Sequence, residues 1–160
     1  MKIDLIQTNF EDHKETIQIW MQTSHIVKFY EQLERKMGTY VLFKAVNESK
    51  ITMGYVCLFE INMIQQTACI DFCFAPDYLS QADVVEALKS AMAYAFHSLQ
   101  LNKVYTKCLN HEEQIRTLYL NMSFIYEGRL RSHYIWKGRS YNLHLSSIMK
   151  DEFDRIYSVG

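Results

Sequence analysis

Basic side chains recur at every second position along one stretch near the C-terminal end of the chain. Arg129, Arg131 and His133 lie within residues 125–136, a run whose composition predicts a β-strand. Alternate residues of a strand share a face, so these three residues, here called the basic row, should point the same way. Guanidinium groups bind phosphates well. The basic row could therefore bind a phosphate group of a substrate or of a cofactor, or it could pair with neighbouring Asp and Glu residues.

A single carboxylate interrupts an apolar run. Asp71 is the only charged residue of Thr67–Phe74, which otherwise has the composition of a buried strand. Burying a carboxylate without a partner is costly. Asp71 therefore needs either a structural partner or a chemical role.

Other chemistries are disfavoured by what the sequence lacks. No metal-ligand spacing connects the histidines His13, His25, His97, His111 and His144. No Cys-x-x-Cys pair occurs, and the cysteines are predicted to be buried, reduced thiols: Cys57, Cys69, Cys73 and Cys108. The sequence also lacks a Gly-Lys-Ser/Thr loop and a nucleophile elbow, which argues against an NTPase or a serine hydrolase.

The composition is that of one folded domain spanning residues 1–160. Hydrophobic residues make up 49% and charged residues 22%, and the formal net charge is −1. Such a balance lacks the basic footprint of most nucleic-acid-binding domains, and one basic strand is too little to suggest one. No apolar run approaches the roughly 18 residues of a membrane span, and the N-terminus lacks a signal-peptide pattern, so we expect a cytoplasmic protein without a membrane partner.

The chemistry-bearing residues fall into a mixed succession of elements. After a first strand, the hydrophobic pattern predicts helices at 9–22 and 24–37, the second closed by Gly38, and then a hairpin of strands 39–46 and 51–60. There follow strand 67–74, helix 82–99, strand 103–108, helix 112–121, strands 125–136 and 141–149, and a last helical turn or two at 151–157. The order β-α-α-β-β-β-α-β-α-β-β belongs to the α+β class.

Aromatic residues alternate with the basic row. Tyr134 and Trp136 fall on the opposite face of the same predicted strand. We expect them to pack in the core or against a second copy of the chain, which would make a homodimer.

Several segments resemble the Gcn5-related N-acetyltransferases, the GNAT superfamily. The similarity at the level of residues runs from about Ala82 onward and is carried by Leu101–Tyr105, Ile115–Tyr119, Phe124–Tyr134, Lys137–Tyr141 and Ser147–Phe153. The glutamate-glycine-x-leucine-arginine-x-histidine run at 127–133 is similar to the branch that contains ribosomal-protein N-terminal acetyltransferases and the amino-sugar-nucleotide acetyltransferases of pseudaminic acid synthesis.

This resemblance implies a GNAT-like α+β fold. Its central mixed sheet would have six to seven strands, flanked by about four helices, with two strands that splay apart at the cofactor site. It also implies an enzyme that moves an acetyl group from acetyl-CoA, its co-substrate, to a primary amine, without a metal.

The resemblance further implies where the cofactor lies. Pantetheine would lie between strands 67–74 and 103–108, and the pyrophosphate would rest on the N-terminus of the helix that begins near residue 82. A backbone N–H near the end of the first of these strands would polarise the thioester carbonyl. The cofactor-binding residues implied in this way are Phe74, Ala75, Ser80, Gln81, Ala82, Asp83, Asn110 and Arg116.

The chain departs from the family pattern around this turn. Ser80 stands where a glycine is usual, and Asp77 stands where a basic residue or Gln is usual. Ser80 followed by Asp83 instead resembles a capping box, in which a helix satisfies its own N-terminus. Either the turn still holds CoA, or it caps itself and the cofactor site is damaged. Glu112 replaces a usual asparagine, and Ser123 a usual glycine.

Catalytic roles follow from the same resemblance. Tyr119 matches the tyrosine that commonly acts as general acid, and a phenol can protonate a departing thiolate. Many relatives place a glutamate where this chain has Cys69. Asp71 lies two residues further on the same face, so it becomes the candidate general base or amine-binding residue, with a water relay or a structural pairing as alternatives. The basic row is the candidate acceptor-binding group.

The sequence therefore predicts an N-acetyltransferase. Its acceptor would be a small amine, such as an amino sugar or its nucleotide, or else a protein N-terminus. Two alternatives remain: a non-catalytic module of this fold used for binding or assembly, and an acyltransferase that takes a longer acyl-CoA or an acyl carrier protein.

Overall fold

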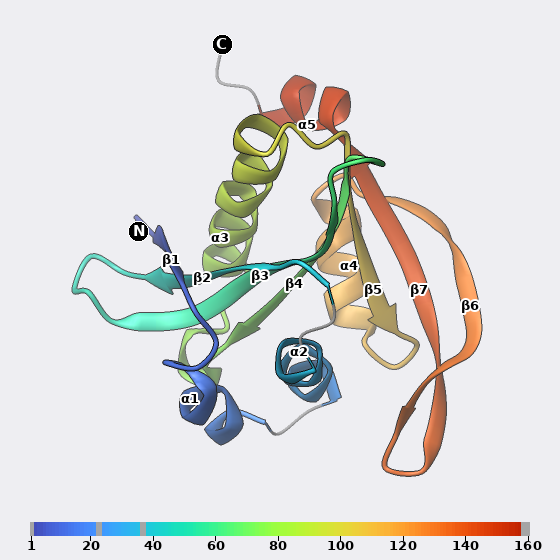
Figure 1. The fold of residues 1–160 in the computed structure, drawn as a ribbon, viewed down its shortest axis with the longest axis horizontal. Coiled ribbons are helices and arrows are strands. Elements are labelled where there is room, and N and C mark those ends of the chain that lie inside the picture. The colour runs from blue at the N-terminus through green and yellow to red at the C-terminus, as the bar shows by residue number, and fades with distance from the viewer. Residues whose placement is uncertain (1, 22–23, 36–37, 158–160) are drawn as a thin grey trace.

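The computed structural model describes residues 2–21, 24–35 and 38–157, and the strands within them form one mixed sheet (Figure 1). The strands are β1 (Asp4–Thr8), β2 (Val41–Val46), β3 (Thr52–Asn62), β4 (Thr67–Phe74), β5 (Lys103–Leu109), β6 (Ile125–Trp136) and β7 (Arg139–Met149), in the spatial order β1-β2-β3-β4-β5-β7-β6. The α-helices are α1 (Lys14–Ile19), α2 (Ser24–Glu34), α3 (Gln81–Ala93), α4 (Glu113–Asn121) and α5 (Lys150–Tyr157).

The element order and the sheet confirm the predicted α+β fold. Strands β1 to β4 pair antiparallel with their neighbours. The chain passes from β1 to β2 through α1 and α2, whereas short turns join β2 to β3 and β3 to β4, and the hairpin between β2 and β3 turns at residues 47–50 as expected. The long connection through α3 makes β4 and β5 the one parallel pair in the described sheet. Strands β4 and β6 have the predicted bounds.

The parallel pair β4–β5 comes apart after three residues. Thr67 pairs with Lys103, Ala68 with Val104 and Cys69 with Tyr105, and beyond these pairs the two strands diverge. The sheet therefore has a split between the C-terminal halves of β4 and β5, which is the predicted splay. Figure 1 shows β5 leaning away from β4 toward β7 at this point.

Helices cover the two faces of the sheet unequally. On one face, α3, α4 and α5 pack over a large apolar cluster that draws on strands from β2 to β7. On the other face, α1 and α2 pack over a smaller apolar cluster. Apart from the half-buried Tyr105, this second cluster takes its sheet residues from β2, β3 and β4 alone.

Local hydrogen bonds explain where the helices differ from expectation. The helix predicted at 9–22 is shorter, because the Asp12 N–H donates to the side chain of Asn9 at 2.9 Å and closes a separate turn before α1 begins. The helix predicted at 24–37 is helical over Ser24–Glu34, and Met37 lies outside the described residues. Gly38, with φ of +80°, has the left-handed backbone that suits a glycine after a helix.

The long helix predicted at 82–99 begins at Gln81 and changes at its end. After Ala93 it continues as a π-helical turn, Tyr94–Ser98. No helix among the described residues is both long and apolar enough to cross a membrane.

Candidate active site

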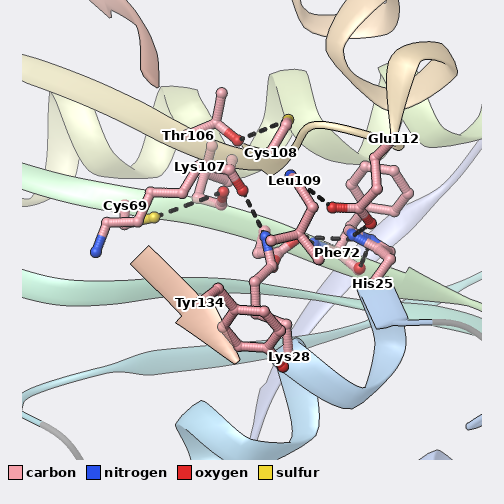
Figure 2. A network of polar contacts seen from close by, with 12 residues as sticks. His25, Lys28, Cys69, Phe72, Thr106, Lys107, Cys108, Leu109, Glu112 and Tyr134 are labelled. Carbon is pink, nitrogen blue, oxygen red and sulfur yellow. Dashed lines mark hydrogen bonds and ion pairs between the residues drawn. The ribbon is translucent and has the colours of Figure 1, made fainter. Parts of the chain in front are cut away.

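Four charged side chains are buried together at the split between β4 and β5 (Figure 2). These residues, here called the buried tetrad, are His25 and Lys28 of α2, Asp71 of β4 and Glu112, which precedes α4; each is 4–7% exposed. Residues three apart on a helix lie on one face, so α2 can present both cations to the split. Asp71 projects to the same side because it alternates with Cys69 and Cys73 of the smaller cluster.

The buried tetrad pairs two cations with two carboxylates. His25 Nε2 lies 3.4 Å from Asp71 Oδ1, and its Nδ1 lies 3.3 Å from Glu112 Oε2. Lys28 Nζ lies 3.6 Å from Asp71 Oδ2. Glu112 Oε1 also accepts the N–H of Leu109 at 2.8 Å, which ties α4 to the end of β5. Buried charges need such compensation because water is excluded.

The same side chains take up backbone groups that the split leaves without a strand partner. His25 Nε2 donates to the carbonyl of Phe72 in β4 at 2.6 Å. The Phe72 N–H donates to Asp71 at 2.8 Å. Across the gap, Lys28 Nζ donates to the carbonyl of Lys107 in β5. Figure 2 shows α2 reaching both diverging strands with these two side chains.

Mutual attraction favours the charged forms of His25, Lys28 and Glu112. Burial by itself lowers the pKa of His25, but Asp71 and then Glu112 outweigh it and raise that pKa above the usual value. The pKa of Lys28 is also raised, because Asp71 and Glu112 outweigh its burial. Burial raises the pKa of Glu112, but His25 and Lys28 lower it below its usual value. Asp71 thus has the structural partners that a buried carboxylate requires, and its role as a general base stays a prediction.

Tyr119 lies on the other face of the sheet, in the large apolar cluster. It is 1% exposed, and its ring centroid lies 6.2 Å from that of Phe72 and 5.0 Å from that of Phe124. Its hydroxyl makes no hydrogen bond of good geometry among the described residues, and the side chain of Thr106 is the polar group beside it, whose effect on the pKa of Tyr119 is smaller than that of burial. Burial, and after it the charge of Asp71, raises the pKa of Tyr119 well above its usual value, so the hydroxyl keeps its proton. An unpaired buried O–H is costly and is ready to donate to a group that enters the split.

The turn before α3 has the predicted cap. Ser80 is the N-cap residue, and its Oγ accepts the N–H of Asp83 at 3.3 Å. The N–H groups of Gln81 and Ala82 make no hydrogen bond within the described residues. They remain available to an anion at the positive end of the helix. The residues present therefore fit a pyrophosphate through two backbone donors rather than through a glycine cradle.

The end of β4 leads to this turn along a tightly packed path. A Cβ on Gly54 of β3 would lie 2.4 Å from the ring of Phe74, so only glycine lets that ring cross β3. The Ala75 N–H donates to the carbonyl of Met53 at 2.9 Å. Phe74 and Ala75 are therefore held by β3, and their role toward the cofactor stays a prediction.

The two remaining cofactor candidates lie beside α4. Asn110 Oδ1 accepts the N–H of Asn142 at 3.1 Å, which ties the end of β5 to β7. Arg116 has a buried Nη1 without a partner among the described residues, and its Nη2 is 4.0 Å from Glu113. Arg116 therefore has a free donor for an anion, whereas Asn110 already has a structural bond.

The basic row lines an open hollow of about 640 Å³ in β6 and β7. The alternation on which the prediction rested is broken, because a bulge lies between Leu130 and Tyr134, and Ser132 has φ of +48°. Leu130 and Ser132 line the same hollow as the basic row, so the expectation of one clean basic face is wrong at the bulge.

A second pocket, of about 230 Å³, lies beside the first and faces α2. Lys28 and Glu31 of α2, Glu60 of β3 and Lys107 of β5 contribute its charged wall, and His133 lines both the pocket and the hollow. The hydroxyl of Tyr134 donates to Glu31 at 3.4 Å, so this aromatic residue faces α2 and the pocket.

Sequence reasoning missed the contribution of α2. It considered His25 only as a metal ligand and did not single out Lys28 or Glu31. A cation within the apolar stretch 25–33 was a signal that some buried anion must face it. The partner, Asp71, lies 43 positions away from Lys28, so only the fold brings the two together.

The cysteine prediction is confirmed for all four residues. Each is free and buried. Burial raises the pKa of Cys69 and of Cys108 to about 12, which keeps both thiols protonated and unreactive. Among the described residues, no group of three or more His, Cys, Asp or Glu side chains could hold a metal ion.

Comparisons with known proteins agree with the observed fold. Residues 5–124 match the model of the acetyltransferase (GNAT) domain. The spermidine N(1)-acetyltransferase of Vibrio cholerae is 21% identical over 151 residues, which cover 91% of this chain and 86% of that protein. The spermidine N(1)-acetyltransferase of Escherichia coli K12 is 28% identical over 100 residues, 62% of this chain and 54% of that protein.

A solved structure shows the same fold. The spermidine/spermine N-acetyltransferase SpeG from Vibrio cholerae superposes with a TM-score of 0.80 at 20% identity, over 98% of each chain. The matching relatives include both spermidine acetyltransferases and the "Putative ribosomal N-acetyltransferase YdaF" of Bacillus subtilis, which is 24% identical over 101 residues, so they do not fix the branch that the run 127–133 resembles, and this branch stays a prediction. The match over residues 5–124 and the split mixed sheet together establish that the chain belongs to the GNAT family of acetyl-CoA-dependent N-acetyltransferases.

Proposed function

We propose that this protein transfers the acetyl group of acetyl-CoA to the primary amine of a small molecule. One observation carries the proposal: the split between β4 and β5 has an unpartnered, fully buried hydroxyl, that of Tyr119, on one face and a charged pocket on the other. A thioester in the split would lie between a proton donor and an entrance for the amine.

The reaction needs two proton transfers. The amine loses a proton and attacks the thioester carbonyl, so that a C–N bond forms while the C–S bond breaks. The departing thiolate takes a proton, and the proposed donor is the hydroxyl of Tyr119. The proton lost by the ammonium goes to water or to Asp71, whose carboxylate already contacts His25 and Lys28. The bound cofactor supplies the activated acetyl group.

The pocket favours a small acceptor. Its volume of about 230 Å³ suits a metabolite-sized amine better than a folded protein terminus. The relatives named above make spermidine the first acceptor to test. The resemblance at 127–133 adds amino sugars and their nucleotides, and a protein N-terminus is the remaining class.

The test is release of free CoA thiol in the presence of each acceptor, followed by Tyr119→Phe. We expect acceptor-dependent release by the wild type and a fall in kcat of about 100-fold in Tyr119→Phe, because a positioned acid typically contributes at least that much. Removing an unpaired hydroxyl should leave the free energy of unfolding nearly unchanged.

Tyr126→Phe is the matched control. Tyr126 is 46% exposed at the sheet edge, and among the described residues its hydroxyl bonds only to His144, at 2.9 Å, so the variant should keep the wild-type rate. Full activity in Tyr119→Phe would remove this residue from the mechanism. Absence of thiol release with every acyl-CoA and acceptor, despite acetyl-CoA binding, would instead support a binding or assembly module.

A further inference from the structure

The pocket beside α2 reaches the split through Lys28, which belongs both to its wall and to the buried tetrad. We call it the acceptor pocket, and the reasoning below rests on the proposed function. Its charges decide which amines it can hold.

The acceptor pocket offers one uncommitted carboxylate. Glu60 is already neutralised, since Lys107 Nζ lies 2.8 and 3.0 Å from its two oxygens and Tyr105 donates to it as well. Within the part of the chain that the structure describes, the carboxylate of Glu31 has only the hydroxyl of Tyr134 as a partner, at 3.4 Å. Glu31 lies one helical turn from Lys28 on the same face of α2. One ammonium group can therefore be held here, close to the split.

Positive charge exceeds negative charge around the acceptor pocket and the adjoining hollow. Arg35 lines the acceptor pocket, and Arg129 and Arg131 line the adjoining hollow. None of these three guanidinium groups has a carboxylate within 4.0 Å among the described residues. The whole chain carries a formal net charge of only −1, so the excess is local.

The two hollows can serve one molecule. His133 lines both, so a ligand held at Glu31 has the basic row next to it. A polyamine would bring a second and third ammonium toward guanidinium groups, which repel it. A phosphate or carboxylate at the same place would meet fork-shaped donors that match its oxygens.

We propose that the acceptor is a small primary amine that also carries an anionic group. Glu31 and Tyr134 hold the ammonium near the split, and the guanidinium groups of Arg129 and Arg131, with His133, hold the phosphate or carboxylate. The site thus selects its substrate by the charge that the substrate carries at the end remote from its reacting amine.

The experiment compares four amines of similar length, and the longer spermidine, with saturating acetyl-CoA: 3-aminopropyl phosphate, 4-aminobutyrate, the neutral 4-aminobutanol and putrescine. We expect kcat/KM for at least one anionic amine to exceed that for putrescine by at least tenfold, and the advantage to shrink as salt rises. The ratio between phosphate and carboxylate identifies the anionic group. A higher kcat/KM for putrescine or spermidine would overturn the proposal.

Substitutions test whether Arg129 and Arg131 cause the preference for anionic amines. The double change Arg129→Gln and Arg131→Gln should lower the ratio of kcat/KM for the best anionic amine to that for 4-aminobutanol by about tenfold. Arg155→Gln is the control, because Arg155 is exposed on α5, at the opposite end of the molecule from the β6–β7 turn (Figure 1). In this variant the ratio of the two kcat/KM values should equal that of the wild type. A ratio that the double variant leaves intact would also overturn the proposal.

Measurements of amine binding test the charge preference independently of the proposed acetyl transfer. Titration of the acetyl-CoA-bound protein with 3-aminopropyl phosphate, 4-aminobutyrate and putrescine measures the charge preference without turnover. If no amine releases thiol but an anionic amine binds at least tenfold more tightly than putrescine, the proposed function fails and the charge preference stands. Tighter binding of putrescine refutes the preference, whatever the turnover.

Discussion

The two faces of the sheet are built on different principles. The face under α3, α4 and α5 is apolar from β2 to β7, and its largest side chains, such as Phe96 and Leu88, are fully buried. The face under α1 and α2 is apolar only over β2, β3 and β4. Where that apolar cover ends, the buried tetrad and the acceptor pocket begin.

This difference shows where the molecule can carry chemistry. An apolar core holds the strands together without directing any polar group, whereas charges taken out of water must be matched one by one. The split between β4 and β5 lies where the apolar face of the sheet meets the charged part of the opposite face. Tyr119 comes from the apolar side and the buried tetrad from the charged side, and both reach Phe72.

The largest expected effect is on the apolar face. Phe96→Ala removes a fully buried ring that packs against Phe153 at a centroid distance of 5.2 Å. We expect a loss of about 3–5 kcal/mol in the free energy of unfolding, measured by urea denaturation. Ile135→Ala, at a side chain 66% exposed, should cost less than about 0.5 kcal/mol. Equal losses in the two variants would show that the apolar face is not the main source of stability.

A smaller loss is expected when the charged face is broken. Lys28→Met removes one of the two cations beside Asp71 and leaves the backbone carbonyl of Lys107 without its donor, which should cost about 3 kcal/mol in the free energy of unfolding. Adding Asp71→Leu should restore part of the loss, because it removes the carboxylate that Lys28 neutralised, whereas the Phe72 N–H and the Lys107 carbonyl stay without these partners.

The matched control is Lys89→Met, whose ion pair with Glu86 at 3.2 Å lies on the surface. It should change the free energy of unfolding by less than about 1 kcal/mol. A Lys28→Met variant as stable as this control would mean that the charges of the split contribute nothing to folding.

The charged face should also respond to pH. The pKa of His25 is raised, so its contribution to stability is complete below its ordinary value of 6.5 and is lost as pH rises through the raised value. The pKa of Glu112 is lowered, so its contribution is complete above 4.5 and is lost as pH falls through the lowered value. Both contributions are complete between pH 4.5 and 6.5.

Urea denaturation of the wild type and His25→Gln across pH 4 to 9 measures this window. The advantage of the wild type should be greatest between pH 4.5 and 6.5 and should decline toward pH 9. His97→Gln, which removes a surface imidazole 2.7 Å from Asp154, is the control for an exposed pair. A wild-type advantage that stays constant over this range would contradict the assigned charge state of His25.

The smallest change in the free energy of unfolding is expected at the start of α3, one of the helices that cover the apolar face. Ser80→Ala removes the acceptor of the Asp83 N–H and should cost about 1 kcal/mol in the free energy of unfolding. Ser90→Ala, an exposed position further along α3, should show no such loss. A Ser80→Ala variant with unchanged stability would show that the cap does not stabilise α3.

The sequence predicted what depends on local pattern. The element order, the bounds of β4 and β6 and the cap at Ser80 follow from residue periodicity and from hydrogen bonds a few positions apart. The splay between β4 and β5 and the place of Tyr119 came from the family resemblance, because no local pattern shows that two strands will part.

The parts that were missed depend on distant pairs. Whether Asp71 meets a cation cannot be read from its own strand, since both of its partners lie on α2, far back in the chain. The bulge at Ser132 was missed for another reason: the alternation of Arg129, Arg131 and His133 is regular in sequence, and the extra residue shows only in the pairing with β7.

The short ladder between β4 and β5 has a mechanical consequence. Three residue pairs make the only direct junction between the half-sheet β1–β4 and the half-sheet β5–β7–β6 in the described structure. On the α2 side, the free ends of the junction are spanned by His25 and Lys28, which hold Phe72 and Lys107 from one short helix. The separation of the two strands on this side is therefore set by the lengths of two side chains rather than by a continuous ladder of backbone hydrogen bonds.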